Sequence, residues 1–113
     1  MTVKEIIEKL HLNALTGQEK LDVEVTGGYT SDLLSDVIAN SKEGNLWITL
    51  QIHQNTVAVA KLKDLAGIII VNNREPDEDT LKKAKEESVP ILCSNDMAFV
   101  ISGKLYELIS SQD

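Results

Sequence analysis

Apolar and polar residues along the chain follow two different spacings, and the changes between them mark successive helices and strands. Residues 2–11 place apolar side chains from Val3 to Leu10 at helical spacing, and Thr2 and Glu5 stand at the positions of a capping box. A first helix is therefore expected there. The same spacing predicts further helices over residues 30–41, 55–65, 75–88 and 96–110.

Extended segments separate these helices. Residues 67–72, with the sequence GIIIVN, hold four β-branched residues in succession, the pattern of a strand buried on both faces. Residues 21–25 alternate valines with acids, as a half-exposed strand does. Strands are also expected in residues 13–17, 46–51 and 90–94. Strands that alternate with helices predict a three-layer α/β/α sandwich with a mostly parallel sheet of about four or five strands.

Length and charge narrow the class of protein. A chain of 113 residues fits one domain, residues 1–113, with one core. The net charge of −7 disfavours nucleic acid and anionic membranes as partners. The single cysteine suits a reducing compartment, and residues 1–10 do not form a signal peptide, so a cytoplasmic location is expected. No spacing typical of a metal site is present, and neither a metal nor a cofactor is expected.

Polar segments follow the predicted strands. Ligands of parallel α/β sheets bind outside the carboxyl ends of the strands, so these segments are expected to share one edge and to form a site. They are Thr26-Gly27-Gly28-Tyr29, Gln51-Ile52-His53-Gln54-Asn55, Asn72-Asn73-Arg74 and Ser94-Asn95-Asp96. The ligand-binding residues predicted from them and from the helix start nearby are Thr26, Gly27, Gly28, Ser31, Gln51, His53, Asn55, Asn72 and Ser94.

The pair Gly27-Gly28 allows two interpretations. If it joins a strand to the helix expected from Thr30, free backbone N–H groups and the positive end of that helix would bind an anionic group. Asp32, in the first turn of the expected helix, would compete for the same donors. In the alternative interpretation, the glycines only permit a tight turn or a close approach of strand and helix.

The titratable side chains do not form a recognisable catalytic set, and no catalytic residue is predicted. His53 is expected either to be a loop histidine bonded to the backbone or to act as a base or ligand contact. Cys93 is expected to be buried at the end of a strand. Asp32 and Asp36, one turn apart, are typical of partners for a helix dipole.

The segments VTGGYTSDLLSDV, WITLQIHQNTVAVAKLKDLAGIIIVN, VPIL and GKLYELI resemble a stand-alone DRTGG domain, from about Val23 onward. Of the name-giving motif, at residues 24–28, this chain keeps Thr26, Gly27 and Gly28. The family is similar to the N-terminal domain of HPr kinase/phosphatase and, more remotely, to that of Mur ligases, which implies a parallel α/β sheet. DRTGG domains accompany CBS pairs or phosphate acetyltransferase domains, which implies regulation, and stand-alone members often neighbour iron-only hydrogenase genes.

Kinase activity is not expected despite this resemblance. A phosphate-binding loop has the form Gly-x4-Gly-Lys-[Ser/Thr], whereas Gly103-Lys104 is preceded by Ala98 at the first glycine position and followed by Leu105. We therefore expect a non-catalytic regulatory module that binds a small polar ligand, either nucleotide-like or anionic. The alternatives are an accessory subunit or small enzyme of hydrogenase-linked redox metabolism, and a purely structural homo-oligomer.

Self-association is expected from the segment NTVAVAKL, residues 55–62. Its apolar residues fall on both faces of the predicted helix, so a second subunit is expected to cover part of them in a homodimer. These residues are Val57, Ala58, Val59, Ala60 and Leu62.

Overall fold

A five-stranded sheet forms the centre of the molecule. The computed structural model describes residues 1–112. The strands are β1 (Asn13–Ala14), β2 (Gly27–Thr30), β3 (Asn45–Thr49), β4 (Gly67–Ile70) and β5 (Ile91–Cys93). They lie in the order β1-β5-β4-β3-β2; β1 is antiparallel to β5, and the other four strands run parallel. The predicted, mostly parallel sheet is confirmed.

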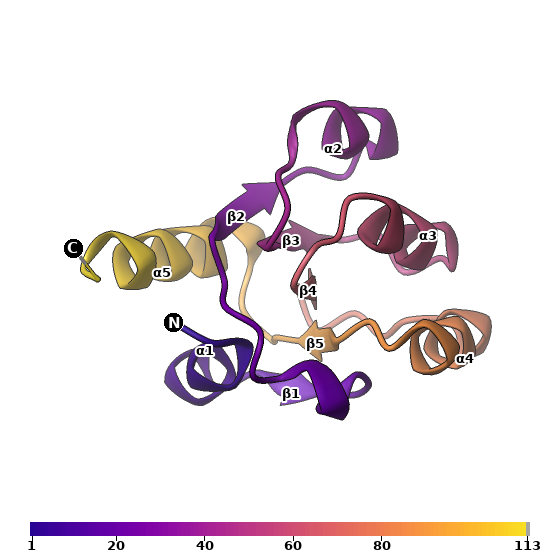
Figure 1. Cartoon of the computed structure of the whole chain (residues 1–113), viewed down its shortest axis with the longest axis horizontal. Helices are drawn as coiled ribbons and strands as arrows, with labels where there is room; N and C mark the ends of the chain where they lie inside the picture. Colours follow the sequence, from indigo (N-terminus) through magenta and orange to yellow (C-terminus); the bar gives the residue numbers. More distant parts are fainter. Residues whose placement is uncertain (113) are drawn as a thin grey trace.

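Helices cover both faces of this sheet. They are α1 (Val3–Leu10), α2 (Leu34–Asn40), α3 (Asn55–Leu62), α4 (Glu78–Glu87) and α5 (Ala98–Ser110), with a 3-10 helix η1 (Gln18–Lys20) after β1. α1 and α5 lie on one face, and α2, α3 and α4 lie on the other (Figure 1). The fold is the expected α/β/α sandwich. None of the helices within residues 1–112 combines the length and the apolar composition needed to cross a bilayer.

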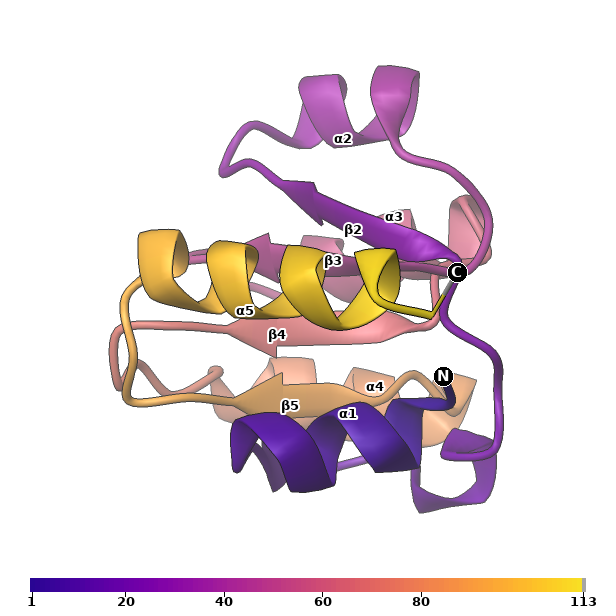
Figure 2. The ribbon, with the colours of Figure 1, turned by 90° about the vertical axis from the view of Figure 1, so that its left-hand side faces the viewer.

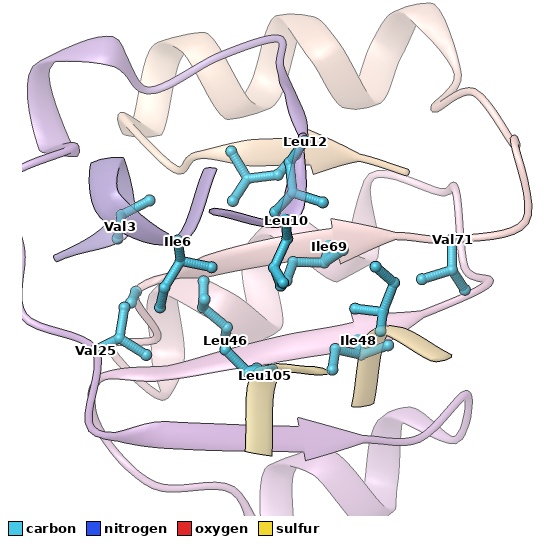
Figure 3. Close-up of a cluster of buried hydrophobic side chains, with 13 residues drawn as sticks. Val3, Ile6, Leu10, Leu12, Val25, Leu46, Ile48, Ile69, Val71 and Leu105 are labelled. Carbon is cyan, nitrogen blue, oxygen red and sulfur yellow. The ribbon is translucent and has the colours of Figure 1, made fainter. Parts of the chain in front are cut away.

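Two hydrophobic cores, one on each face of the sheet, hold the layers together. The first, beneath α1 and α5, includes Leu46 and Ile69 (Figure 3). The second, beneath α2, α3 and α4, includes Trp47, Ile68 and Ile70. Because successive side chains of a strand point to opposite faces, the isoleucine run of β4 contributes to both cores. This is why the run shows no alternation of apolar and polar residues.

Residues 21–25, predicted as a strand, instead supply hydrogen-bond acceptors to the start of α1. This helix begins with the predicted capping box. The Val3 N–H donates to the Val23 carbonyl at 3.0 Å, and the Lys4 N–H donates to the Leu21 carbonyl at 2.9 Å. N–H groups of the first helical turn have no partner inside the helix, and this segment satisfies two of them. The strand prediction was wrong because these backbone groups are used by a helix.

The start of α2 also differs from the prediction over residues 30–41. Thr30 is the last residue of β2, and α2 begins only at Leu34. Between them the Ser31 hydroxyl accepts a hydrogen bond from the Leu33 N–H at 3.2 Å. Such a local turn offers the backbone an alternative to the helix, so the residues expected in the first helical turn form a loop.

The apolar residues of α3 are mostly covered within the chain. Val57, Val59 and Ala60 are buried in the second core, because α3 lies between α2 and α4 on the sheet. Ala58 and Leu62 are the exposed members of the predicted set. The chain itself therefore covers three of the five residues, and a homodimer that covers Ala58 and Leu62 stays a prediction.

The close approach of β2 and α5 makes Gly28 sensitive to substitution. A Cβ atom at Gly28 would lie 2.8 Å from Leu105 Cδ2, and Leu105 is buried in the first core. We expect Gly28→Val to lower the free energy of unfolding in urea by about 1 kcal/mol or more. The matched variant Gly103→Ala places its Cβ in open space within α5 and should raise that free energy by up to about 1 kcal/mol. Equal stability of Gly28→Val and the parent chain would contradict the packing described.

Candidate functional site

The loops that leave β3, β4 and β5 meet at the carboxyl edge of the sheet. The Asn72 N–H donates to the Asp96 carbonyl at 2.8 Å, which ties the exit of β4 to that of β5. The Asp77 N–H donates to the Ile52 carbonyl at 3.1 Å, which ties the segment before α4 to the exit of β3. Three of the four polar segments singled out in the sequence therefore lie at one edge, as expected.

The fourth segment lies elsewhere. Gly27 and Gly28 are the first two residues of β2, so Thr26 stands at the opposite, amino edge of the sheet. The Thr26 hydroxyl donates to the Glu43 carbonyl at 2.8 Å and accepts from the Asn45 amide at 3.2 Å. The glycine pair does not join a strand to a helix start, and the anion site predicted on that geometry is wrong. The segment that follows β2 at the carboxyl edge is the loop after Thr30, not the glycine segment.

Asp32 connects the exits of β2 and β3. Its Oδ1 accepts hydrogen bonds from the Thr49 hydroxyl at 2.9 Å and from the Leu50 N–H at 2.8 Å. The Gln51 side-chain amide donates in return to the Asp32 carbonyl at 2.8 Å. This residue was expected in the first turn of a helix, where it would interact with the dipole. In the structure it fixes one wall of the site.

A pocket of about 290 Å³ lies between these exits. It is lined by Asp32, Leu50, Gln51, Ile52, His53 and Arg74. His53 Nδ1 lies 3.0 Å from Asp77 Oδ2, so the carboxylate orients the ring, while two thirds of the His53 side chain stays exposed. Arg74 is the only arginine of the sequence and brings a permanent positive charge to the rim.

The turn after β4 places Arg74 beside the pocket. Asn72 and Asn73 adopt φ values of 66° and 56°, in the left-handed region, which asparagine tolerates better than most residues. The Asn73 N–H donates to the Ser94 carbonyl at 2.9 Å, which holds this turn against the exit of β5. The two asparagines thus reverse the chain so that the arginine follows at the sheet edge.

The predicted site residues divide into three groups. Gln51 and His53 line the pocket. Ser31, Asn55, Asn72 and Ser94 lie at the same edge but outside its lining: Asn55 begins α3, and the Ser94 hydroxyl accepts from the Asp96 N–H at 3.0 Å. Thr26, Gly27 and Gly28 lie away from it. Two polar lining residues, Asp32 and Arg74, were outside the predicted ligand-binding set, as were the apolar Leu50 and Ile52. The polar residues after β2 and β4 were a signal for Asp32 and Arg74.

Cys93 ends β5 and is half-buried. Burial raises the pKa of its thiol, which favours the protonated form over the nucleophilic thiolate. Within residues 1–112 the structure brings together no group of three histidine, cysteine or carboxylate side chains that could hold a metal ion.

Comparisons with known proteins identify a solved structure with a similar fold. No family model and no curated protein matches the chain. Among solved structures, the chain is similar to the CBS and DRTGG domains of the regulatory region of Clostridium perfringens pyrophosphatase. That structure is a complex with the activator diadenosine tetraphosphate. The TM-score is 0.71 at 13% sequence identity over 93% of this chain. The match spans 45% of that chain. At this identity the likeness concerns the fold alone, which is of the DRTGG and CBS type.

The hydrogen bonds of Asp32 can be tested separately from ligand binding. Asp32→Ala leaves the Leu50 N–H and the Thr49 hydroxyl without their acceptor. We expect faster hydrogen exchange of the Leu50 amide and a loss of about 1–3 kcal/mol in the free energy of unfolding, because Thr49 is buried and its hydroxyl is left without this acceptor. The control Asp22→Ala removes an exposed carboxylate elsewhere. Unchanged protection of Leu50 in the Asp32 variant would show that this bond does not hold the loop.

Proposed function

We propose that this chain is a regulatory module that senses a small polar ligand bearing an anionic group. The observation that carries this proposal is the convergence of His53 and Arg74, from the exits of β3 and β4, on one pocket at the carboxyl edge. Carboxyl edges of parallel α/β sheets are where such folds bind ligands.

The lining residues suggest the chemical class of the ligand. The Arg74 guanidinium can form paired hydrogen bonds with a phosphate or a carboxylate, and His53, oriented by Asp77, can add another polar contact. The Asp32 carboxylate on the same lining suits hydroxyl or amino groups of the ligand. At about 290 Å³ the pocket lies at the lower end of the usual range of roughly 300–1,000 Å³. It therefore suits a small metabolite or one part of a nucleotide.

The structural neighbour supports the choice of ligands to test first. The region of the pyrophosphatase that shares this fold is regulatory, and the structure holds a nucleotide activator. At 13% identity that likeness concerns the fold, so the nucleotide enters here as a hypothesis for this chain.

Binding at this pocket would also have a mechanical consequence. A ligand that contacts both His53 and Arg74 would connect the loop before α3 to the loop before α4. Loops have fewer packing contacts than the sheet and are the segments that ligands most readily order. Ordering of these two loops is the change that we propose a partner protein or a neighbouring domain detects.

Thermal unfolding in the presence of candidate ligands tests the proposal. The set comprises AMP, ATP, diadenosine tetraphosphate, inorganic phosphate and free amino acids. A compound at ~100 times its dissociation constant stabilises the fold by 2.7 kcal/mol, which is about 10 °C for a domain of this size. We expect at least one nucleotide to give a concentration-dependent shift.

Three variants locate the site. Arg74→Gln and His53→Ala should each remove most of the shift, because they delete the cation and the oriented ring. Lys61→Gln, in a separate pocket at the amino edge, is the matched control and should keep it. Equal shifts in all three variants, or no shift with any compound, would overturn the proposal.

A further inference from the structure

A second concave surface lies between the edge strand β2 and α5, away from the ligand pocket. It is a groove of about 480 Å³. Its β-strand side is formed by Gly27, Gly28 and Thr30, and its helical side includes Tyr106 and Ile109. None of its lining residues within 1–112 is charged. Figure 2 shows α5 extended along this margin of the sheet, beside β2.

The outer face of α5 continues this uncharged surface. Phe99, Gly103, Tyr106 and Ser110 follow one another at intervals of four, three and four residues, so they form one stripe on the helix. Phe99 is 87% exposed and Tyr106 is 75% exposed. Two largely exposed aromatic side chains on one stripe of a helix indicate a surface that another molecule covers.

The pattern of this stripe is complementary to itself. Large residues alternate with small ones, and the intervals between them read the same in both directions along the helix. If two α5 helices pair antiparallel around a point between Gly103 and Tyr106, each Tyr106 meets the partner's Gly103. Each Phe99 then meets the partner's Ser110. An interface with a two-fold axis uses the same patch on both subunits, which is what this arrangement provides.

Charge also selects this face for contact with a second copy. The chain has a net charge of −7, so two copies repel each other over most of their surfaces. In the part of the chain that the structure describes, the groove lining and the stripe carry no charge, and the neighbouring Lys104 and Glu107 have opposite signs. This face can therefore meet its own copy without bringing like charges together.

We propose that the groove between β2 and α5, together with the stripe, binds a second copy of the chain and forms a homodimer. A dimer of standard size buries ~800 Å² on each subunit, an eighth of the 6205 Å² surface of this chain. Phe99 and Tyr106 alone offer roughly 300 Å² of this area.

Light scattering on the full chain at high micromolar concentration tests this inference. The parent chain should show twice the 12.4 kDa mass of one chain. Gly103→Glu should show the mass of one chain, because it places a charge at the centre of the stripe. A Cβ at this position meets nothing within 4 Å, and glutamate favours helix more than glycine does, so the fold is preserved. Circular dichroism verifies that it is.

The control Ala58→Glu introduces the same charge at an exposed position of α3 and should remain dimeric. A second variant, Tyr106→Lys, should be monomeric as well, since each lysine would place an unpaired charge against the partner's Gly103 in the middle of the interface. A single-chain mass for the parent chain would overturn the inference. So would a dimer that persists in both stripe variants, or a dimer lost in Ala58→Glu. The ligand pocket is not part of this surface, so the result does not depend on the proposed function.

Discussion

The burial of β3 and β4 on both faces is the constraint on which the rest of the structure depends. Every residue of β3 (Asn45–Thr49) and β4 (Gly67–Ile70) is buried, and the two strands pair in parallel. Strands buried on both sides need helices on both sides, which gives the three layers. Parallel pairing also sends every exit of the central strands to one edge, and the candidate site is composed of those exits.

Sequence reasoning succeeded where burial controls the pattern. The run GIIIVN predicts a strand buried on both faces, because an uninterrupted series of β-branched residues is typical of such strands. The capping box of α1 was recognised because it needs only Thr2 and Glu5, three residues apart. The order of elements along the chain, and with it three of the four segments expected at the carboxyl edge, followed from these elements.

Prediction from the sequence failed where hydrogen bonds join residues that are far apart along the chain. The alternating valines of residues 21–25 have the pattern of a strand, but the carbonyls of Leu21 and Val23 accept hydrogen bonds from the first turn of α1. The two glycines of β2 have low strand propensity, yet they lie in the edge strand. A glycine is needed at position 28 because α5 packs too closely for a larger residue there. The bonds between Asp32 and Leu50 and between His53 and Asp77 have no local signal, so the lining of the pocket could be predicted only in part.

Ligand binding at the carboxyl edge is the central claim about this protein, and amide chemical shifts report on that edge directly. Titration of the ¹⁵N-labelled chain with the nucleotide that gives the largest thermal shift should perturb the amides of Gln51, His53 and Arg74 first. The amides of α1 and of η1 should change little, because they lie away from the pocket. Perturbations centred on the amino edge or on the groove between β2 and α5 would contradict the account.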